Sequence, residues 1–238
     1  MKTNYLNIRY GIKDDIKEFN YQIQLYWVAG SANKKKIKHL SSKNPLVINK
    51  GGVYRIIKKG RGSNNRVIIE DGCYLDNVVI HMIGNNNTIK FGKNVYVGPG
   101  CSFWTEGNNC KIIIGENTTF TQKVHFNAQE DNSEIICGND CMFSNTIIVR
   151  TSDSHAIIDE ETHERLNFAG NVIIGDHVWV APHATIMKGV NIGSNTIVGS
   201  HTLVTKSIPS NVLCVGMPAK VVKERVTWSR EDIIFKEK

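Results

Sequence analysis

The chain has 238 residues, of which 41% are hydrophobic and 21% charged, and its formal net charge is +7. This composition is typical of a globular protein and excludes a largely disordered chain. Because it contains no run of about 18 apolar residues and residues 1–10 lack the apolar core of a signal peptide, we expect a cytoplasmic protein without a transmembrane segment.

Residues 1–43 precede any regular repeat. Residues 12–40 mix apolar and charged side chains, and we expect them to form a helix that caps the structure that follows. The lysines at 34–36 and 38 are not interleaved with aromatic residues or a recognition motif. We interpret them as a solvated or anion-attracting face and predict no nucleic-acid partner.

Residues 44–216 contain apolar residues at intervals of six. The last six of these positions are Ile174, Val180, Ile186, Ile192, Val198 and Val204. Upstream, sets of three recur every 23 residues, at Ile68, Tyr74 and Ile80, then Phe91, Val97 and Phe103, then Ile114, Phe120 and Phe126, then Cys137, Phe143 and Val149. A fixed period of this kind is the signature of a solenoid.

A six-residue unit is too short for a helix but long enough for a short strand and a bend. We therefore predict triangular coils of three strands, with the repeated apolar residues pointing inward and each coil hydrogen-bonded to its neighbours. The residue four positions later is small or β-branched and should fill the corner, as at Val95, Cys101, Thr118, Val124, Val178, Ala184, Thr196 and Thr202. Because no Cys-x-x-Cys pair occurs, we interpret the six cysteines as buried free thiols.

The polar stretch 151–171 interrupts the repeat. Such a break is a loop, and loops on rigid scaffolds carry functional sites. After Gly216, residues 217–238 are predicted to form an extended segment followed by a short helix. The predicted organisation is thus an N-terminal cap segment (1–43), a solenoid domain (44–216) with its loop at 151–171, and a C-terminal segment (217–238).

The stretch from Asn171 to Lys223 contains the hexads together with GDHVWVAP, VTKSIP and VGMPAKVVK. It resembles the left-handed β-helix, hexapeptide-repeat acyltransferases. A loop histidine followed 24 residues later by a tryptophan, here His155 and Trp179, resembles the galactoside and maltose acetyltransferases and, more closely, the polysialic-acid and capsular polysaccharide O-acetyltransferases. The predicted fold is therefore an all-β solenoid, a left-handed parallel β-helix with short N-terminal and C-terminal helical caps. The resemblance also implies acetyl-CoA as donor and a homotrimer with active sites between adjacent subunits.

His155 is the predicted general base. O-acetylation removes a proton from a sugar hydroxyl as its oxygen attacks the thioester, and an imidazole is suited to this at neutral pH. The flanking Ser152, Asp153 and Ser154 are expected to orient the other ring nitrogen. Trp179 is expected to face outward. The resemblance implies that its indole, or a nearby backbone N–H, contacts the acetyl group and the acceptor, the alternative being packing against a neighbouring subunit.

The resemblance also implies a set of residues that bind the cofactor. Small or polar residues along the pantetheine arm and the nucleotide would be Ala181, Ser200, Thr205 and Lys206, beside Trp179, while Lys220 and Lys223 would meet phosphate. Related enzymes often carry arginine at the last two positions, and lysine keeps the charge but not the bidentate geometry. No metal is expected.

The basic net charge favours an acidic acceptor, since it raises the local concentration of polyanions. We therefore predict an O-acetyltransferase acting on a capsular or other surface polysaccharide, such as one carrying sialic or uronic acids. One alternative is an acetyltransferase of a small sugar or nucleotide-linked amino sugar, although residues 1–43 are too few for the extra domain such enzymes commonly carry. Another is a non-catalytic scaffold, which would have no reason to bind CoA.

A further alternative concerns three histidines. His177, His183 and His201 share one hexad position, so we expect them along one edge of the solenoid. They are similar in this to the zinc ligands of the γ-class carbonic anhydrases, which use the same fold. The carboxylate and glutamine residues that this class pairs with its zinc have no clear counterpart here, so this alternative is less favoured.

Overall fold

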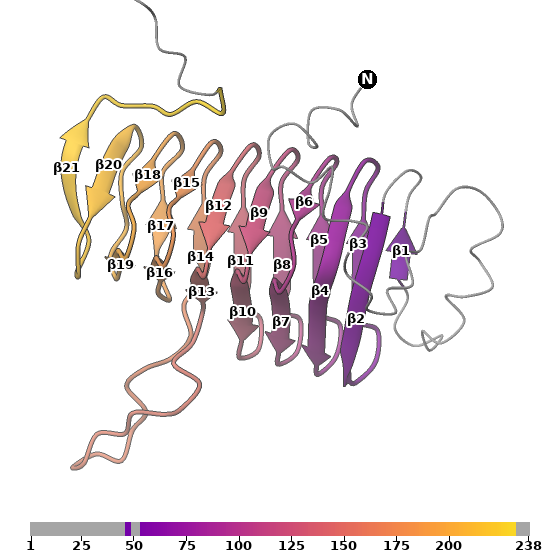
Figure 1. Cartoon of the computed structure of the whole chain (residues 1–238). Coiled ribbons are helices and arrows are strands. Elements are labelled where there is room, and N and C mark those ends of the chain that lie inside the picture. Colours follow the sequence, from indigo (N-terminus) through magenta and orange to yellow (C-terminus); the bar gives the residue numbers. More distant parts are fainter. Residues whose placement is uncertain (1–45, 49–52, 232–238) are drawn as a thin grey trace, which may run out of the picture.

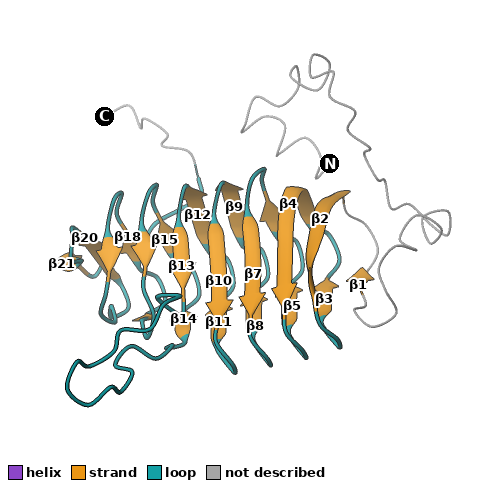
Figure 2. Cartoon of the chain, turned by 90° about the horizontal axis from the view of Figure 1, so that it is seen from below, coloured by secondary structure: helices purple, strands orange, loops and turns teal. Residues whose placement is uncertain are grey.

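Each coil of the chain lies directly on the coil before it, so strands that follow one another along the solenoid pair in parallel (Figures 1 and 2). The computed structural model describes residues 46–48 and 53–231, and these contain strands and loops but no helix. Consequently, no helix of the described residues is long and apolar enough to cross a membrane. The predicted all-β parallel solenoid is confirmed.

The strands form three faces. The first face holds β6 (Tyr96–Val97), β9 (Thr119–Gln122), β12 (Met142–Asn145), β15 (Trp179–Val180), β18 (Ile197–Val198), β20 (Val212–Val215) and β21 (Lys220–Glu224). The second holds β2 (Val53–Arg61), β4 (Tyr74–Ile83), β7 (Ser102–Glu106), β10 (His125–Gln129), β13 (Ile148–Arg150), β16 (Thr185–Ile186) and β19 (Leu203–Val204). The third holds β1 (Leu46–Ile48), β3 (Arg66–Ile69), β5 (Thr88–Phe91), β8 (Lys111–Ile114), β11 (Glu134–Cys137), β14 (Val172–Ile174) and β17 (Asn191–Ile192). The long β4 turns the corner between the first two faces, since it pairs with both β6 and β7.

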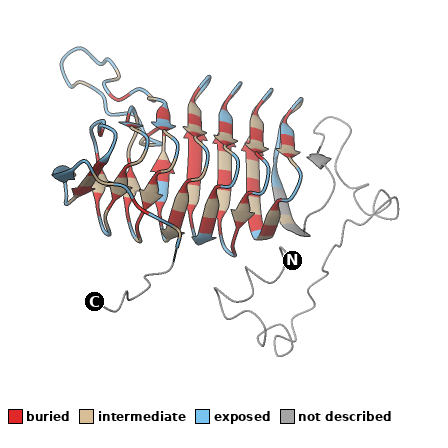
Figure 3. Ribbon diagram, turned by 90° about the horizontal axis from the view of Figure 1, so that it is seen from above, coloured by how far each residue is buried: buried red, intermediate tan, exposed pale blue. Residues whose placement is uncertain are grey.

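The core is a column of stacked apolar side chains. Along most strands, buried residues alternate with exposed or half-buried ones (Figure 3). Phe120 lies at the centre of the column, stacked on Phe143 with ring centroids 4.7 Å apart and in edge contact with Phe103 and Phe126 at 5.5 Å. The predicted corner residues are all fully buried. The column therefore joins consecutive coils through one continuous core.

The six cysteines are free and buried, as the sequence indicates. Burial raises the pKa of Cys73, Cys101 and Cys214 to about 11. These thiols therefore carry no charge near neutral pH and contribute to packing.

The close stacking of the coils explains the glycines of the repeat. A Cβ on Gly115 would lie 2.4 Å from the carbonyl oxygen of Gly138, one coil further on. A Cβ on Gly193 would lie 2.4 Å from the backbone nitrogen of Ser210. No side chain fits at these positions because the backbone of the next coil lies where the Cβ would be.

The predicted register is wrong in the first coil. Ile69 pairs with Phe91 and Leu75 with Val97, a spacing of 22 residues, whereas Ile80 pairs with Phe103 at the expected 23. The predicted inward residues Ile68 and Tyr74 therefore lie on the outer side, where Tyr74 stacks on Tyr96 at 5.1 Å. A shift of one residue along a strand exchanges its two faces. The other positions of the repeat are buried.

The C-terminal helical cap is not present in residues 217–231. In its place, β21 pairs antiparallel with β20, and residues 225–231 continue without helix or strand. The unpaired edge of β20 offers backbone hydrogen bonds that an isolated short helix cannot match. The N-terminal cap segment 1–43, with its lysine cluster, lies outside the described residues.

We predict that Phe120→Ala lowers the free energy of unfolding by about 3–5 kcal/mol, because it opens a cavity among three other phenyl rings. Gln122→Ala, at the exposed end of the same strand, is the control and should change it by about 0.5 kcal/mol or less. Urea denaturation measures both. Equal effects of the two substitutions would contradict the assignment of Phe120 to the core.

Candidate active site

The loop at 151–171 leaves the solenoid between β13 and β14, at the corner that joins the second and third faces (Figure 1). Its first residue is fixed to the scaffold, since Thr151 Oγ1 accepts from Gln129 N at 2.8 Å and donates to Gln129 O at 3.0 Å. Lys188, two residues after β16, donates to Asp153 Oδ2 at 2.6 Å and to Asn167 O at 3.0 Å. Both ends of the loop are thus fastened to the next coil.

A second ion pair fastens the loop from the preceding coil. Arg165 forms a bidentate pair with Glu130, with nitrogen–oxygen distances of 2.8 and 2.6 Å. Ser152 donates to the same carboxylate at 2.6 Å. A planar guanidinium on a carboxylate fixes direction as well as distance, so this pair sets how the loop projects from the solenoid.

The charges of this fastening persist over the physiological pH range. The hydrogen bond from Arg165 lowers the pKa of Glu130 below its ordinary 4.5, and the hydrogen bonds from Lys188 and Asn167 lower the pKa of Asp153 below its ordinary 3.8. A carboxyl whose pKa is lowered by folding contributes stability above its unfolded pKa and loses it as pH falls through the folded pKa. The loop is therefore fastened at neutral pH and released only in acid.

His155 lies on this loop with an exposed side chain, while its backbone carbonyl accepts from Asn167 Nδ2 at 2.8 Å. The expected role of the three preceding residues is not supported by their hydrogen bonds. Ser152 bonds to Glu130 and Asp153 to Lys188, while Ser154 lies between Arg150 and Gln129. These side chains hold the loop, and the imidazole remains on its surface.

Trp179 lies on β15 with its side chain on the outer side of the first face. Its backbone N–H donates to Thr196 O at 2.9 Å and belongs to the ladder of the sheet. The indole Nε1 is buried and finds no acceptor among the described residues. Of the two donors on this residue, only the indole N–H is therefore free for a ligand.

The proposed cofactor residues fall into two groups. The first group lies on or beside the first face. Ala181, 6% exposed, follows the strand that carries Trp179, and Lys220 and Lys223 are exposed on β21. Ser200 is exposed on the turn after β18. Thr205 and Lys206 instead follow β19, at the corner from which the His155 loop leaves. In a three-sided solenoid that corner is opposite the first face, so one chain does not bring His155 and Trp179 together.

An aromatic row lies beside the base of the loop, on the outer side of the second face. Trp104 contacts His81 and His125 edge-on, with ring centroids 4.8 and 5.0 Å apart. Asn127 is next to Trp104 in register, and its Oδ1 is buried without a partner among the described residues. Burial, aided by the charge of Arg150, lowers the pKa of His125 and so favours its neutral ring. The sequence contains the signal for this row, since His81, Trp104 and Asn127 recur at the 23-residue period of the repeat and therefore lie side by side.

The three histidines of the hexads do not share one edge. His183 and His201 stack with ring centroids 4.6 Å apart, but His177 stacks on Trp228 at the corner between the third and first faces. Consecutive hexads occupy consecutive corners, so only residues 18 apart in this part of the chain share one. No cluster of three or more metal-ligating side chains occurs in residues 53–231.

A family model described as bacterial transferase hexapeptide (six repeats) matches residues 171–206. The polysialic acid O-acetyltransferase of Escherichia coli O1:K1 / APEC is 37% identical over 86 residues, which are 36% of this chain and 28% of that protein. The galactoside O-acetyltransferase of Escherichia coli (strain K12) is 32% identical over 85 residues, or 34% of this chain and 42% of that protein. In these alignments the chain spans less than half the length of either relative.

Two solved structures match over more of their length. The polySia specific acetyltransferase NeuO has a TM-score of 0.71 and 32% identity, over 81% of this chain and 81% of that one. The polysialic acid O-acetyltransferase OatWY has a TM-score of 0.61 and 29% identity, over 76% of this chain and 94% of that one.

We predict that Lys188→Met loosens the loop, because it removes both bonds of this lysine and leaves Asp153 without its cation. Partly exposed ion pairs contribute up to about 1 kcal/mol to the stability of the segment that they hold. The rate of amide hydrogen exchange in residues 153–168, measured by mass spectrometry, should therefore rise about fivefold. Lys111→Met is the matched control, since Lys111 pairs with Glu134 at 2.6 Å on the third face. The same loop exchange in both variants would show that Lys188 does not fasten it.

Proposed function

The chain belongs to the hexapeptide-repeat acyltransferase family, and on this premise we propose that it transfers the acetyl group of acetyl-CoA to a hydroxyl of an acidic surface polysaccharide. The observation that carries the proposal is the 32% identity to a polySia specific acetyltransferase over 81% of each chain. The formal net charge of +7 supports an anionic acceptor. The left-handed winding and the cytoplasmic location remain predictions.

In the proposed reaction His155 is the general base. Its imidazole takes the proton of a sugar hydroxyl while the hydroxyl oxygen forms a bond to the thioester carbon. The carbon–sulfur bond then breaks, and the imidazolium returns the proton to the CoA sulfur. The fastened loop supports this role, because it holds the backbone of His155 while leaving its ring exposed.

The donor side of the proposed site is the first face. A negative charge develops on the thioester oxygen during attack, and donors aimed at that oxygen lower the barrier. The backbone N–H of Trp179 is occupied by Thr196 O, so we propose the indole N–H as a contact of the acetyl group. Ala181 would allow a narrow pantetheine arm to pass, and Lys220 and Lys223 would meet phosphates as point charges.

The acceptor side would be the second face. The row of Trp104, His81 and His125 offers ring surfaces of the kind that pack on sugar rings, and Arg150 adds a positive charge beside it. This row ends at the base of the loop that carries His155, since Ser154 joins Gln129 of β10 to Arg150 of β13. A polymer lying on it would present a hydroxyl to His155.

A complete site would then need two copies of the chain, because His155 and Trp179 are on opposite sides of one solenoid. We propose that His155 of one subunit meets the first face of the next, in a homotrimer. Ile157, Leu166 and Phe168 of the loop are 56%, 61% and 65% exposed, and contact with a second subunit would remove this apolar surface from water.

We predict that His155→Ala lowers the rate of CoA thiol release from acetyl-CoA by about 10² to 10⁴ with an acidic polysaccharide, through loss of the general base. His163→Ala is the matched control, since His163 is exposed on the same loop, and it should keep near wild-type activity. Neutral polysaccharides and small sugars are assayed as further acceptors. Turnover only on small sugars would favour the first alternative, whereas no turnover and no CoA binding would favour a scaffold.

The two-chain site predicts complementation. His155→Ala and Trp179→Ala chains are each expected to be nearly inactive, but oligomers formed by co-expressing them should contain sites with both side chains intact. Random mixing makes about a quarter of sites complete. Activity of co-expressed chains no higher than that of either variant alone would place the whole site within one chain.

A further inference from the structure

One corner of the solenoid carries a column of polar residues. At the junction of the third and first faces, Asn117, Asp140, His177, Asn195 and Asn211 occupy the same place in successive coils, with φ between 53° and 63°. Asparagine and aspartate tolerate this left-handed conformation best among residues with side chains, and histidine is also enriched there. The column therefore presents one polar side chain per coil.

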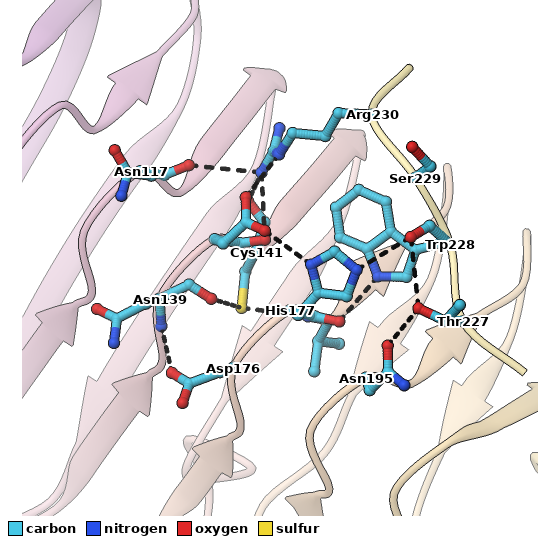
Figure 4. A network of polar contacts seen from close by, with 12 residues as sticks. Asn117, Asn139, Cys141, Asp176, His177, Asn195, Thr227, Trp228, Ser229 and Arg230 are labelled. Carbon is cyan, nitrogen blue, oxygen red and sulfur yellow. Dashed lines mark hydrogen bonds and ion pairs between the residues drawn. The ribbon is translucent and has the colours of Figure 1, made fainter. Parts of the chain in front are cut away.

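The C-terminal segment, residues 226–231, runs back along this column (Figure 4). Val226 N donates to Asn211 O at 3.1 Å, and Thr227 Oγ1 donates to Asn195 Oδ1 at 2.5 Å. Arg230 Nε donates to Asp140 Oδ1 at 2.7 Å, three coils below Asn211. The length of the segment matches the height of the column, since the four residue steps from Val226 to Arg230, if extended, and the three coil spacings from Asn211 to Asp140 each cover about 14 Å.

Trp228 is the central contact of this segment. It is 8% exposed, and its Nε1 donates to His177 O at 2.8 Å. Its ring stacks on the His177 imidazole with centroids 4.2 Å apart and planes 8° from parallel. Its other neighbour is the Trp179 indole, at 6.3 Å. Trp228 thus connects the polar column to the indole proposed to contact the acetyl group.

His177 is held between two acceptors. Nδ1 lies 2.7 Å from Asp140 Oδ2, and Nε2 lies 3.0 Å from the backbone oxygen of Trp228. A neutral imidazole has one N–H and cannot donate to both, whereas an imidazolium can. Both contacts are therefore hydrogen bonds only when the ring carries an N–H on each nitrogen.

The charges around this ring are Asp140 on the turn before β12 and Arg230 on the C-terminal segment itself. Although partial burial alone would raise it, the pKa of Asp140 is lowered by the hydrogen bonds from His177 and Arg230. Arg230 also donates to Cys141 O at 2.7 Å and to Thr119 Oγ1 at 3.0 Å. Arg230 therefore anchors the segment wherever Asp140 is ionised, and His177 adds a contact that depends on its N–H groups.

We propose that residues 226–231 form a C-terminal clasp that positions Trp179 through Trp228, and that the clasp docks fully only while His177 is charged. The role assigned to Trp179 rests on the proposed function. Docking itself does not, because it follows from the contacts of the column.

An imidazolium satisfies both acceptors and a neutral ring satisfies only one, so raising the pH is expected to weaken the clasp. At low pH the two acceptors are both satisfied. At high pH one acceptor faces a ring lone pair, and Trp228 keeps its stacking and its Nε1 hydrogen bond but loses the third of its contacts with His177.

The test is hydrogen exchange of residues 226–231 by mass spectrometry between pH 6 and 8.5, corrected for intrinsic rates. It needs no substrate, so an inactive protein still tests the clasp. We expect protection to fall about tenfold or more across this range in the wild type, as loss of a charge-assisted hydrogen bond predicts. His177→Asn keeps a residue suited to positive φ, and it should show the low protection at every pH.

His183→Asn is the matched control, because His183 has the same backbone conformation and stacks on His201 instead of the segment. It should exchange like the wild type. Protection that is independent of pH in the wild type, or that survives in His177→Asn, would overturn the proposal. Should His177→Asn not fold, the wild-type profile alone decides between these results.

Activity then tests the link to Trp179. The kcat for acetyl transfer should fall at high pH in the wild type and be low at all pH values in Trp228→Ala, with partial rescue in Trp228→Phe, which keeps the stacked ring. A Trp228→Ala variant with wild-type kcat would overturn the positioning role, whatever the exchange data show.

Discussion

Parallel stacking of the coils determines where every side chain of this solenoid lies. Because each coil hydrogen-bonds only to its neighbours at about 4.8 Å, every residue lies directly above its counterpart in the coil below. Similar residues then recur at the same place in successive coils, as in the phenyl column around Phe120 and the corners with left-handed backbone from Asn117 to Asn211. Glycine at Gly115 and Gly193 is required by the same spacing.

The same constraint decides where chemistry can be placed. A strict stack has no room for an extra residue inside, so additions appear either as a loop at a corner or as a chain that runs along the outside. The loop with His155 is the first kind and the segment with Trp228 the second. The loop leaves the corner of the second and third faces, whereas the segment contacts Trp179 on the first face, which is why the site we propose is completed by a second chain.

Most of the fold could be predicted from the spacing of apolar residues, because period six has few other physical explanations. Ile68 and Tyr74 were misplaced since a coil one residue shorter has nearly the same pattern. No helix forms in residues 217–231, because Val221 and its neighbours complete the edge of β20, and the pattern of a short segment does not reveal an open edge. Of the site, the loop and its histidine follow from the break in the repeat. The contacts of Trp228 do not, since its partner His177 is 51 residues away in sequence.

We propose that this scaffold moves an acetyl group onto a polymer hydroxyl. The proton NMR spectrum of polysialic acid after incubation with acetyl-CoA and the purified protein, together with the CoA released, tests this directly. We expect new O-acetyl signals on the sugar, equal in amount to the CoA thiol. Release of CoA with free acetate and an unmodified polymer would contradict it.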